Sequence, residues 1–288
     1  MHYENPVYRP PSEAYSLIVQ ITNGCSHNGC TFCNMYKGKA FRINPLEQVF
    51  EDFDEARLMY GYVDRVFLAD GDALIYPAKD LVDILEYIKK NFPEVKRISS
   101  YATPRSLLLK SEQELSLIHE KGLDMLYLGL ESGSDKVLSL RNKGETSEKI
   151  VEAGKKGIDA GFKVSVTILS GLGGVGLLEE HALETAKALT AMKPHYIGEM
   201  TLNIIPGTKL YEEAKSGDFV MPDPKEILRE TRLIIENTDD EGAVFRSNHV
   251  SNYINIRGTF NEGKNDMIRQ IDSALKNGNF KVRHYTNM

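Results

Sequence analysis

The chain has 288 residues, of which 41% are hydrophobic and 26% are charged, and its formal net charge is −6. An acidic balance without a dense run of Lys and Arg disfavours extensive binding to a nucleic-acid backbone, without excluding it. The longest apolar runs are much shorter than the roughly 18 residues of a membrane span, and the polar start MHYENPVYRPP lacks the features of a signal peptide. We therefore expect a soluble, cytoplasmic protein.

Apolar, β-rich segments alternate with segments of helical spacing through residues 17–204. The predicted strands are LIVQI (17–21), RVFLA (65–69), RISSY (97–101), MLYLGL (125–130), VSVTIL (164–169) and YIGEMTLNI (196–204). Apolar residues recur at helical spacing in 46–53 and 81–88, and Ser111 followed by Glu114 predicts a capping box that opens another helix. This alternation indicates parallel βαβ units.

Six such units suit either a doubly wound sheet or an incomplete (β/α) barrel. Residues of unusual type follow every predicted strand end: Cys25, Gly71, Arg105, Glu131, Gly171 and Pro206. Because ligand sites of parallel sheets gather at the carboxyl ends of the strands, one shared mouth favours the barrel. The predicted fold is a partial (β/α)6 TIM-like barrel over residues 16–217. An N-terminal arm (1–15) precedes it, and a short C-terminal α+β extension (218–288), with helices in 223–238 and 265–278, follows it.

All three cysteines lie in CSHNGCTFC, residues 25–33. An odd, tightly spaced set is more typical of a metal site than of a disulfide framework. A structural zinc site would need His27 as a fourth ligand, and a plant-type ferredoxin cluster would need a fourth cysteine, which the sequence lacks. A [4Fe-4S] cluster on Cys25, Cys30 and Cys33 instead leaves one iron open for an exogenous ligand.

This loop, which follows the first predicted strand and carries Phe32 directly before its last cysteine, resembles the radical S-adenosylmethionine (radical SAM) superfamily. The resemblance implies a [4Fe-4S] cluster on Cys25, Cys30 and Cys33, whose open iron chelates the methionine moiety of S-adenosylmethionine, with Phe32 near the cofactor. The commonest spacing in the superfamily is C-x3-C-x2-C, and this chain has one additional residue between Cys25 and Cys30. We interpret it as a loop insertion that bears on the subfamily rather than on the class.

Motifs at later strand ends extend the resemblance over about residues 15–215. In LADGDAL, the segment Gly71, Asp72 and Ala73 occupies the place of the G-G-E type motif, which implies binding of the methionine ammonium group. Gly71 permits close backbone approach. A simple strand-to-loop turn is the alternative explanation.

The segment LYLGLESGSDKVLSLRNKG is similar to the G-L-E/Q-S-G-S stretch of oxygen-independent coproporphyrinogen oxidases, methylthiotransferases and the Elongator catalytic subunit. The similarity implies that Glu131 bonds the ribose hydroxyls and that Lys143, or its rival Arg141, pairs with the methionine carboxylate. The alternatives are a carboxylate favoured by a helix dipole for Glu131 and a solvated surface charge for Lys143.

The remaining candidates carry less specific signals. Tyr101 ends the third predicted strand and could face the cofactor, and Leu169 leads into SGLGGVG, a glycine-rich turn able to admit the adenine. Ile205 lies in NIIPGTKLY, which resembles the P-G-T stretch of the same families. The set Arg246, Asn248, His249 and Asn252 in FRSNHVSN either contacts substrate or forms a capped turn.

The resemblance implies an anaerobic enzyme that receives an electron from flavodoxin or ferredoxin and cleaves S-adenosylmethionine to methionine and a 5′-deoxyadenosyl radical. The radical would abstract hydrogen from a small-molecule or peptide substrate. No cysteine remains for a second cluster, so sulfur insertion is disfavoured. Two hypotheses from other classes stay open: a zinc-dependent barrel hydrolase or lyase with Cys3His ligation, and a non-catalytic iron-sulfur redox module.

Overall fold

The computed structural model describes residues 1–281, which form two compact units. The first unit contains residues 1–28, 35–128 and 156–164, and the second contains 29–34, 129–155 and the chain from 165 onward. The chain therefore passes between the units several times, within the cysteine loop among other places. The last residues of the predicted C-terminal extension, 282–288, lie outside the described part of the chain.

The first unit is built on parallel strands in the order β1-β4-β5-β6. Their bounds are β1 (Leu17–Gln20), β4 (Arg65–Ala69), β5 (Arg97–Ala102) and β6 (Leu123–Glu131), of which β6 ends in the second unit. The register places Ile18 opposite Phe67, and Phe67 opposite Ser99. A short antiparallel pair, β2 (Thr22–Asn23) and β3 (Arg42–Ile43), flanks the cysteine loop. The parallel arrangement confirms the prediction for this half of the chain.

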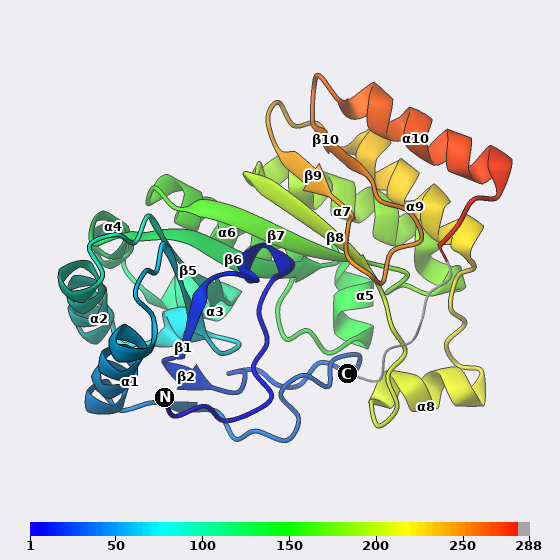
Figure 1. The fold of residues 1–288 in the computed structure, drawn as a ribbon. Helices are drawn as coiled ribbons and strands as arrows, with labels where there is room; N and C mark the ends of the chain where they lie inside the picture. Colours follow the sequence, from blue (N-terminus) through cyan, green and yellow to red (C-terminus); the bar gives the residue numbers. More distant parts are fainter. Residues whose placement is uncertain (282–288) are drawn as a thin grey trace. The chain divides into compact units, whose positions relative to one another are not determined.

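Helices follow the strands of the first unit as the sequence predicts. They are α1 (Leu46–Met59), α2 (Ala78–Asn91), α3 (Pro104–Leu109) and α4 (Glu112–Glu120), with short 3-10 turns η1 (Pro11–Glu13) and η2 (Ala73–Ile75). Helices α1, α2 and α4 pack side by side (Figure 1) and bury apolar faces that include Phe53 and Ile84. The predicted capping box is confirmed, because Ser111 Oγ accepts from Glu114 N at 3.1 Å and Glu114 Oε2 accepts from Ser111 N at 2.7 Å.

The second unit contains the strand order β7-β8-β9-β10. Their bounds are β7 (Lys163–Ser170), β8 (Tyr196–Thr201), β9 (Val244–Arg246) and β10 (Arg257–Thr259). Strands β7, β8 and β9 are parallel, and β10 pairs antiparallel with β9. Strand β8 ends at Thr201, three residues before the end of the predicted strand 196–204.

The helices of the second unit follow β6 along the chain. They are α5 (Asp135–Leu140), α6 (Ser147–Asp159), α7 (Leu178–Met192), α8 (Lys209–Ser216), α9 (Pro224–Asn237) and α10 (Lys264–Asn277), with the 3-10 turn η3 (Val175–Leu177). Helix α6 ends in the first unit. Helix α9 packs against α7 and α10 (Figure 1), and α10 stops at Gly278, whose φ of 67° is the left-handed conformation that a C-terminal glycine supplies.

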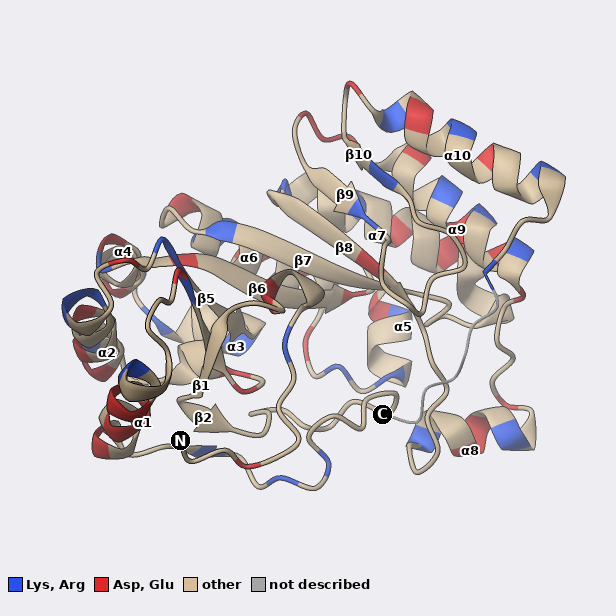
Figure 2. Ribbon diagram, in the orientation of Figure 1, with Lys and Arg blue, Asp and Glu red and all other residues tan. Residues whose placement is uncertain are grey.

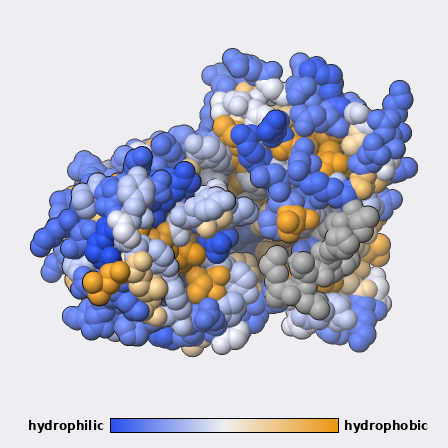
Figure 3. Space-filling model, viewed as in Figure 1, coloured by the Kyte–Doolittle hydropathy of each residue, from blue (hydrophilic) through white to orange (hydrophobic). Residues whose placement is uncertain are grey.

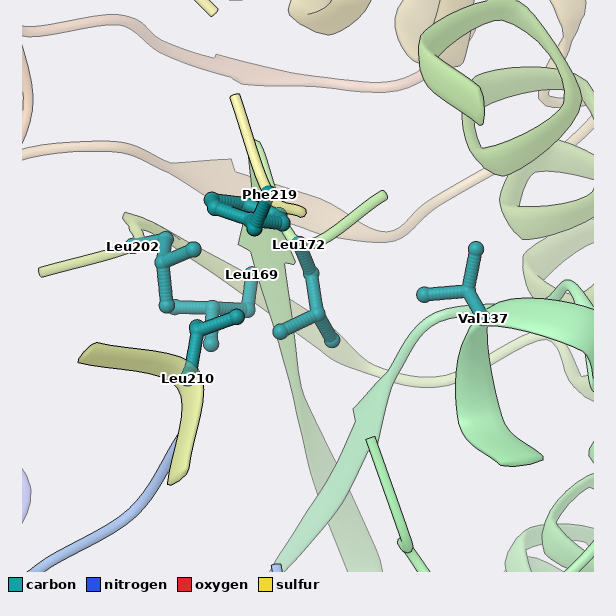
Figure 4. Close-up of a cluster of buried hydrophobic side chains, with 6 residues drawn as sticks. All are labelled: Val137, Leu169, Leu172, Leu202, Leu210 and Phe219. Atoms are coloured by element: carbon teal, nitrogen blue, oxygen red, sulfur yellow. The ribbon is translucent and has the colours of Figure 1, made fainter. Parts of the chain in front are cut away.

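A hydrophobic cluster forms part of the core of the second unit (Figure 4). Its buried members are Val137, Leu169, Leu172, Leu202, Leu210 and Phe219. In Figure 4 the side chains of Leu169, Leu202 and Leu210 lie close together, from β7, the exit of β8 and the start of α8. The cluster therefore fixes the segments that follow two neighbouring strands.

The surface shown in Figure 3 is mostly hydrophilic, with hydrophobic residues in small separate groups. None of the helices within residues 1–281 is both long and apolar enough to cross a membrane.

Candidate functional site

In the first unit, the start of the cysteine loop contacts the turn that follows β4. Gly71 N donates to Gly24 O at 3.0 Å. A Cβ atom at Gly71 would lie 3.1 Å from Cys25 Cβ and 2.7 Å from Tyr36 Cε2. Only glycine leaves room for this approach, so the predicted motif and Cys25 are in direct contact.

Asp72 ties the same turn to the residue after Cys25. Its Oδ2 accepts from Ser26 Oγ at 2.5 Å and from Thr103 Oγ1 at 3.0 Å, and the side chain is fully buried. Its Oδ1 is buried and has no hydrogen-bond partner among the described residues. Burial raises the pKa of Asp72, and the bonds from Ser26 and Thr103 oppose that shift. A buried carboxylate oxygen that lacks a hydrogen-bond donor among the described residues is suited to accept from a positively charged donor. Ala73, the next residue, is buried at the start of η2.

Asp70 is a site residue that the sequence analysis did not select. Its buried Oδ2 accepts from Lys39 Nζ at 2.9 Å, Gln20 Nε2 at 3.0 Å and Gly24 N at 3.2 Å. Burial raises the pKa of Asp70, while the bond from Lys39 lowers it. The signal for this residue is the first acid of LADGDAL, which bonds Gly24 before the cysteine loop and Lys39 after it.

In the second unit, the segment that carries Cys30 and Cys33 is fixed by backbone contacts. Thr31 N donates to Arg141 O at 2.9 Å, and Leu210 N donates to Thr31 O at 3.0 Å. Asn142 Nδ2 donates to Gly29 O at 2.8 Å. Phe32 packs against the hydrophobic cluster of Figure 4. The segment thus lies between the end of α5 and the start of α8.

Helix α5 ends in a Schellman motif that places Lys143. Asn142 has a φ of 50° and donates from its backbone N to Ser139 O at 3.0 Å, while Lys143 N donates to Leu138 O at 2.9 Å. Lys143 Nζ then donates to Glu131 Oε1 at 3.0 Å, and both side chains are about 15% exposed. The predicted pair of Glu131 and Lys143 is therefore brought together.

The rival basic residue, Arg141, lies elsewhere. Its Nη1 is 2.7 Å from Glu213 Oε2, and its guanidinium group is 5.2 Å from the centre of the Phe219 ring. Room for the Glu131–Lys143 pair comes from Gly129, where a Cβ atom would lie 2.3 Å from Glu131 Oε1 and 2.9 Å from Lys143 Nζ. Lys143, and not Arg141, is the basic neighbour of Glu131.

Glu131 has a strained backbone. Its φ is 62°, and Ser132 N donates to Leu130 O at 2.7 Å, so Glu131 is the central residue of a γ-turn with positive φ. Conformations of this kind cost about 1–3 kcal/mol in a residue other than glycine, and they persist where the surroundings impose them. The strain falls on the residue that the resemblance assigns to the ribose.

We expect Glu131→Gly to be more stable than Glu131→Ala by about 0.5–1 kcal/mol, because glycine relieves the positive φ while its greater freedom in the unfolded chain offsets part of the gain. Both variants lose the carboxylate, so the loss of the Lys143 contact cancels in the comparison. Urea unfolding of the two variants measures the difference. At exposed Glu236, inside α9, the alanine variant should instead be more stable than the glycine variant. If the glycine variant were not the more stable one at position 131, the assignment of strain to Glu131 would be contradicted.

The other candidates occupy varied positions. Tyr101 packs edge-on against the rings of Phe67 and Tyr127 at 5.0 and 6.2 Å, and burial raises its pKa far above its usual range. The side chain of Leu169 points into the hydrophobic cluster (Figure 4). Ile205 O accepts from Thr208 Oγ1 at 2.7 Å in the turn that opens α8.

The FRSNHVSN segment is anchored to β8 in the second unit. Thr201 N donates to Ser251 Oγ at 3.1 Å, and Asn252 Nδ2 donates to Glu199 O at 2.8 Å. Arg246 and Asn248 are exposed, and His249 is half-buried. The buried end of this segment is thus held against β8.

The three cysteines are half-buried and are not joined in disulfides. Cys25 belongs to the first unit, and Cys30 and Cys33 belong to the second. No group of three His, Cys, Asp or Glu side chains within residues 1–281 stands in an arrangement that could hold a metal ion.

Residues 19–189 match the family profile described as the Radical SAM superfamily. The chain belongs to the radical SAM superfamily. It is 28% identical over 211 residues to 4'-phospho-dehydrooxetanocin synthase of Priestia megaterium, covering 65% of this chain and 28% of that protein. It is 29% identical over 149 residues to tRNA-2-methylthio-N(6)-dimethylallyladenosine synthase of Orientia tsutsugamushi (strain Boryong), covering 49% of this chain and 32% of that protein. This radical SAM chain thus spans about a third or less of the length of these two relatives.

Solved structures share the radical SAM fold. Coproporphyrinogen III oxidase from Escherichia coli matches with a TM-score of 0.58 and 18% identity, covering 77% of this chain and 52% of that one. Methylornithine synthase matches with a TM-score of 0.56 and 16% identity, covering 89% and 68%. The predicted fold class, a partial (β/α)6 TIM-like barrel, and the predicted group of related families are confirmed.

Membership of the radical SAM superfamily implies a [4Fe-4S] cluster and S-adenosylmethionine as cofactors. The residue types present suit these groups by their donor chemistry, although the three thiols are not gathered around one point in residues 1–281. Three thiols within nine positions are a donor set suited to iron, Gly71 keeps the side of Cys25 open to close approach, and Asp72 Oδ1 is a buried acceptor without a partner among the described residues.

Proposed function

We propose that this protein is a radical SAM enzyme whose Cys25, Cys30 and Cys33 ligate one [4Fe-4S] cluster as thiolates. The observation that carries the proposal is the connection, within the second unit, from the Cys30–Cys33 segment through Asn142 to Lys143 and its partner Glu131. That connection links the cysteine motif to the residues that resemble a nucleoside site. When bound, the cofactors supply reductive cleavage of S-adenosylmethionine and a 5′-deoxyadenosyl radical able to abstract hydrogen.

The chain's own residues bind and orient the S-adenosylmethionine. Asp72 Oδ1 and the backbone of Gly71 and Ala73 accept from the methionine ammonium group, and Lys143 Nζ pairs with the methionine carboxylate. Glu131 Oε atoms accept from the ribose hydroxyls, which requires the carboxylate to share or exchange its bond with Lys143. Lys143 is favoured over Arg141 for this role, because Arg141 is occupied by Glu213. Phe32, Tyr101, Leu169 and Ile205 line the path of the cofactor through their backbone or ring atoms.

The proposed substrate is a small molecule or peptide. Acidic and basic residues are interspersed along the exposed helices α8, α9 and α10 (Figure 2), and the net charge is −6. This pattern offers little long-range attraction to a nucleic-acid backbone. Flavodoxin or ferredoxin is the proposed electron donor, and a reducing cytoplasm, in which three cysteines that form no disulfide can ligate iron, is the proposed location.

The test is anaerobic reconstitution of the protein with iron and sulfide, followed by incubation with S-adenosylmethionine and dithionite. We expect a brown protein that forms methionine and 5′-deoxyadenosine. A colourless protein that binds zinc and no iron would support the Cys3His hydrolase or lyase instead. A brown protein that forms neither product would support a non-catalytic redox module. Cell extract can then be added, and deuterium transferred into 5′-deoxyadenosine identifies the substrate.

A further inference from the structure

Helix α9 of the second unit buries two polar residues on its inner face. Glu230 is fully buried and Thr231 is 2% exposed, and they share that face with Ile227 and Ile234. Neither residue belongs to a motif of the radical SAM match, which ends at residue 189. Buried carboxyl groups are rare unless they have partners, so the contacts of Glu230 call for an explanation.

Glu230 and Thr231 on α9 hold in place Ser170 and Gly171 at the exit of β7. Glu230 Oε2 accepts from Gly171 N at 2.6 Å. Thr231 Oγ1 donates to Glu199 Oε1 at 2.5 Å, and Ser170 Oγ donates to the same oxygen at 2.5 Å. The start of the glycine-rich turn after β7 is therefore set by α9.

The other oxygen of Glu230 faces a chain of buried groups that leads to Glu131. Glu230 Oε1 packs 3.7 Å from His181 Nε2 on α7, where neither atom has a hydrogen-bond partner among the described residues, and His181 Nδ1 is 2.7 Å from Ser132 Oγ. Ser134 N donates to Ser132 Oγ at 3.0 Å. Ser132 directly follows the strained γ-turn at Glu131, so this chain of contacts braces the turn.

Burial shifts the pKa of each of these groups toward favouring its uncharged form. Burial raises the pKa of Glu230 well above its usual value, and the neighbouring Glu199 raises it further. Burial lowers the pKa of His181 to about 4, and burial raises that of Glu199 to about 7. Glu230 therefore acts through hydrogen bonds and packing, and glutamine has nearly the same shape and can still accept from Gly171 N.

We propose that Glu230 is a positioning residue that, through Gly171 and through His181 and Ser132, holds Glu131 and the turn after β7 in the geometry that binds the adenosine part of S-adenosylmethionine. This inference rests on the proposed function, because that function gives Glu131 its ligand. Helix α9, which lies beyond the superfamily match, would thus affect cofactor affinity through the residues that it positions.

The test compares Glu230→Ala, Glu230→Gln and Ser132→Ala with the matched control Glu236→Ala, an exposed acid on the same helix. Amide hydrogen exchange of residues 131–134 and Gly171 is measured in protein without cofactor, and S-adenosylmethionine affinity is measured by calorimetry on reconstituted protein. In Glu230→Ala we expect faster exchange at both places and a roughly tenfold rise in Kd, because Gly171 N loses its buried acceptor. Ser132→Ala should affect residues 131–134 without affecting Gly171.

Glu230→Gln should retain wild-type exchange and affinity, as should Glu236→Ala. Unchanged exchange in Glu230→Ala would overturn the proposal, and so would a Glu230→Gln protein that behaves like Glu230→Ala. If Glu230→Ala does not fold, Ser132→Ala still decides, since unchanged exchange at residues 131–134 would break the proposed path. Wild-type protein that binds no S-adenosylmethionine would refute the proposed function, whereas the exchange comparison would still test the positioning role.

Discussion

Replacing Cys30 with alanine should abolish retention of the iron-sulfur cluster and all cleavage of S-adenosylmethionine. A [4Fe-4S] cluster with three protein ligands has no spare thiolate in this chain, because all three cysteines are already used. The thiol is half-buried in a loop, so its removal should leave the fold unchanged. Iron content, product formation and circular dichroism of the purified variant measure these three outcomes.

His27→Ala is the matched control for the cysteine variant. His27 lies in the same loop and is exposed, and it is the residue that a Cys3His zinc site would require. We expect this variant to keep wild-type iron content and cleavage. A Cys30→Ala protein that still held its cluster and cleaved the cofactor would overturn the ligand assignment, and loss of metal in His27→Ala would favour zinc.

Gly133→Ala should destabilise the protein by about 3 kcal/mol or more, at the upper end of the range for overpacked positions. A Cβ atom there would lie 2.1 Å from Glu184 O and 2.6 Å from Thr185 Cα. Both atoms belong to the backbone of α7, which cannot rotate away as a side chain can. The displacement would also break the 2.9 Å bond from Gly133 N to Thr185 Oγ1. Urea unfolding, with the midpoint lowered at constant slope, measures the effect.

Gly242→Ala serves as the control, because a Cβ atom at Gly242 meets nothing within 4 Å. We expect its stability to stay within about 0.5 kcal/mol of the wild type. Equal stabilities of Gly133→Ala and the wild type would show that the loop after β6 is not packed against α7 as described.

Most of the barrel could be predicted from sequence because its strands are buried, apolar and bounded by turns. Strand β4 matches its predicted bounds, whereas β6 begins two residues before the predicted 125–130. The early start was hidden because Asp124 interrupts the apolar run. In the structure Asp124 Oδ1 lies 3.5 Å from Lys163 Nζ, so an ion pair satisfies the polar residue within the strand.

The site could be predicted only in part. The cysteines and Glu131 stand in recognisable motifs, but sequence offset alone left Arg141 and Lys143 as rivals. The left-handed conformation of Asn142 and the missing side chain of Gly129 let Lys143, and not Arg141, pair with Glu131, and neither effect can be read from the sequence offset. His181 and Glu230 do have a sequence signal, since each is a polar residue on the apolar face of its helix.

The polar contacts made by α9 bear on where this protein can be shortened or recombined. A cut after residue 217 would remove the acceptor of the Gly171 amide and one of the two donors to Glu199 Oε1, leaving only Ser170 Oγ on that oxygen. A barrel expressed without α9 would therefore lack these hydrogen bonds at the exit of β7. In chimaeras made with related proteins, α9 should be kept together with its own β7 and β8.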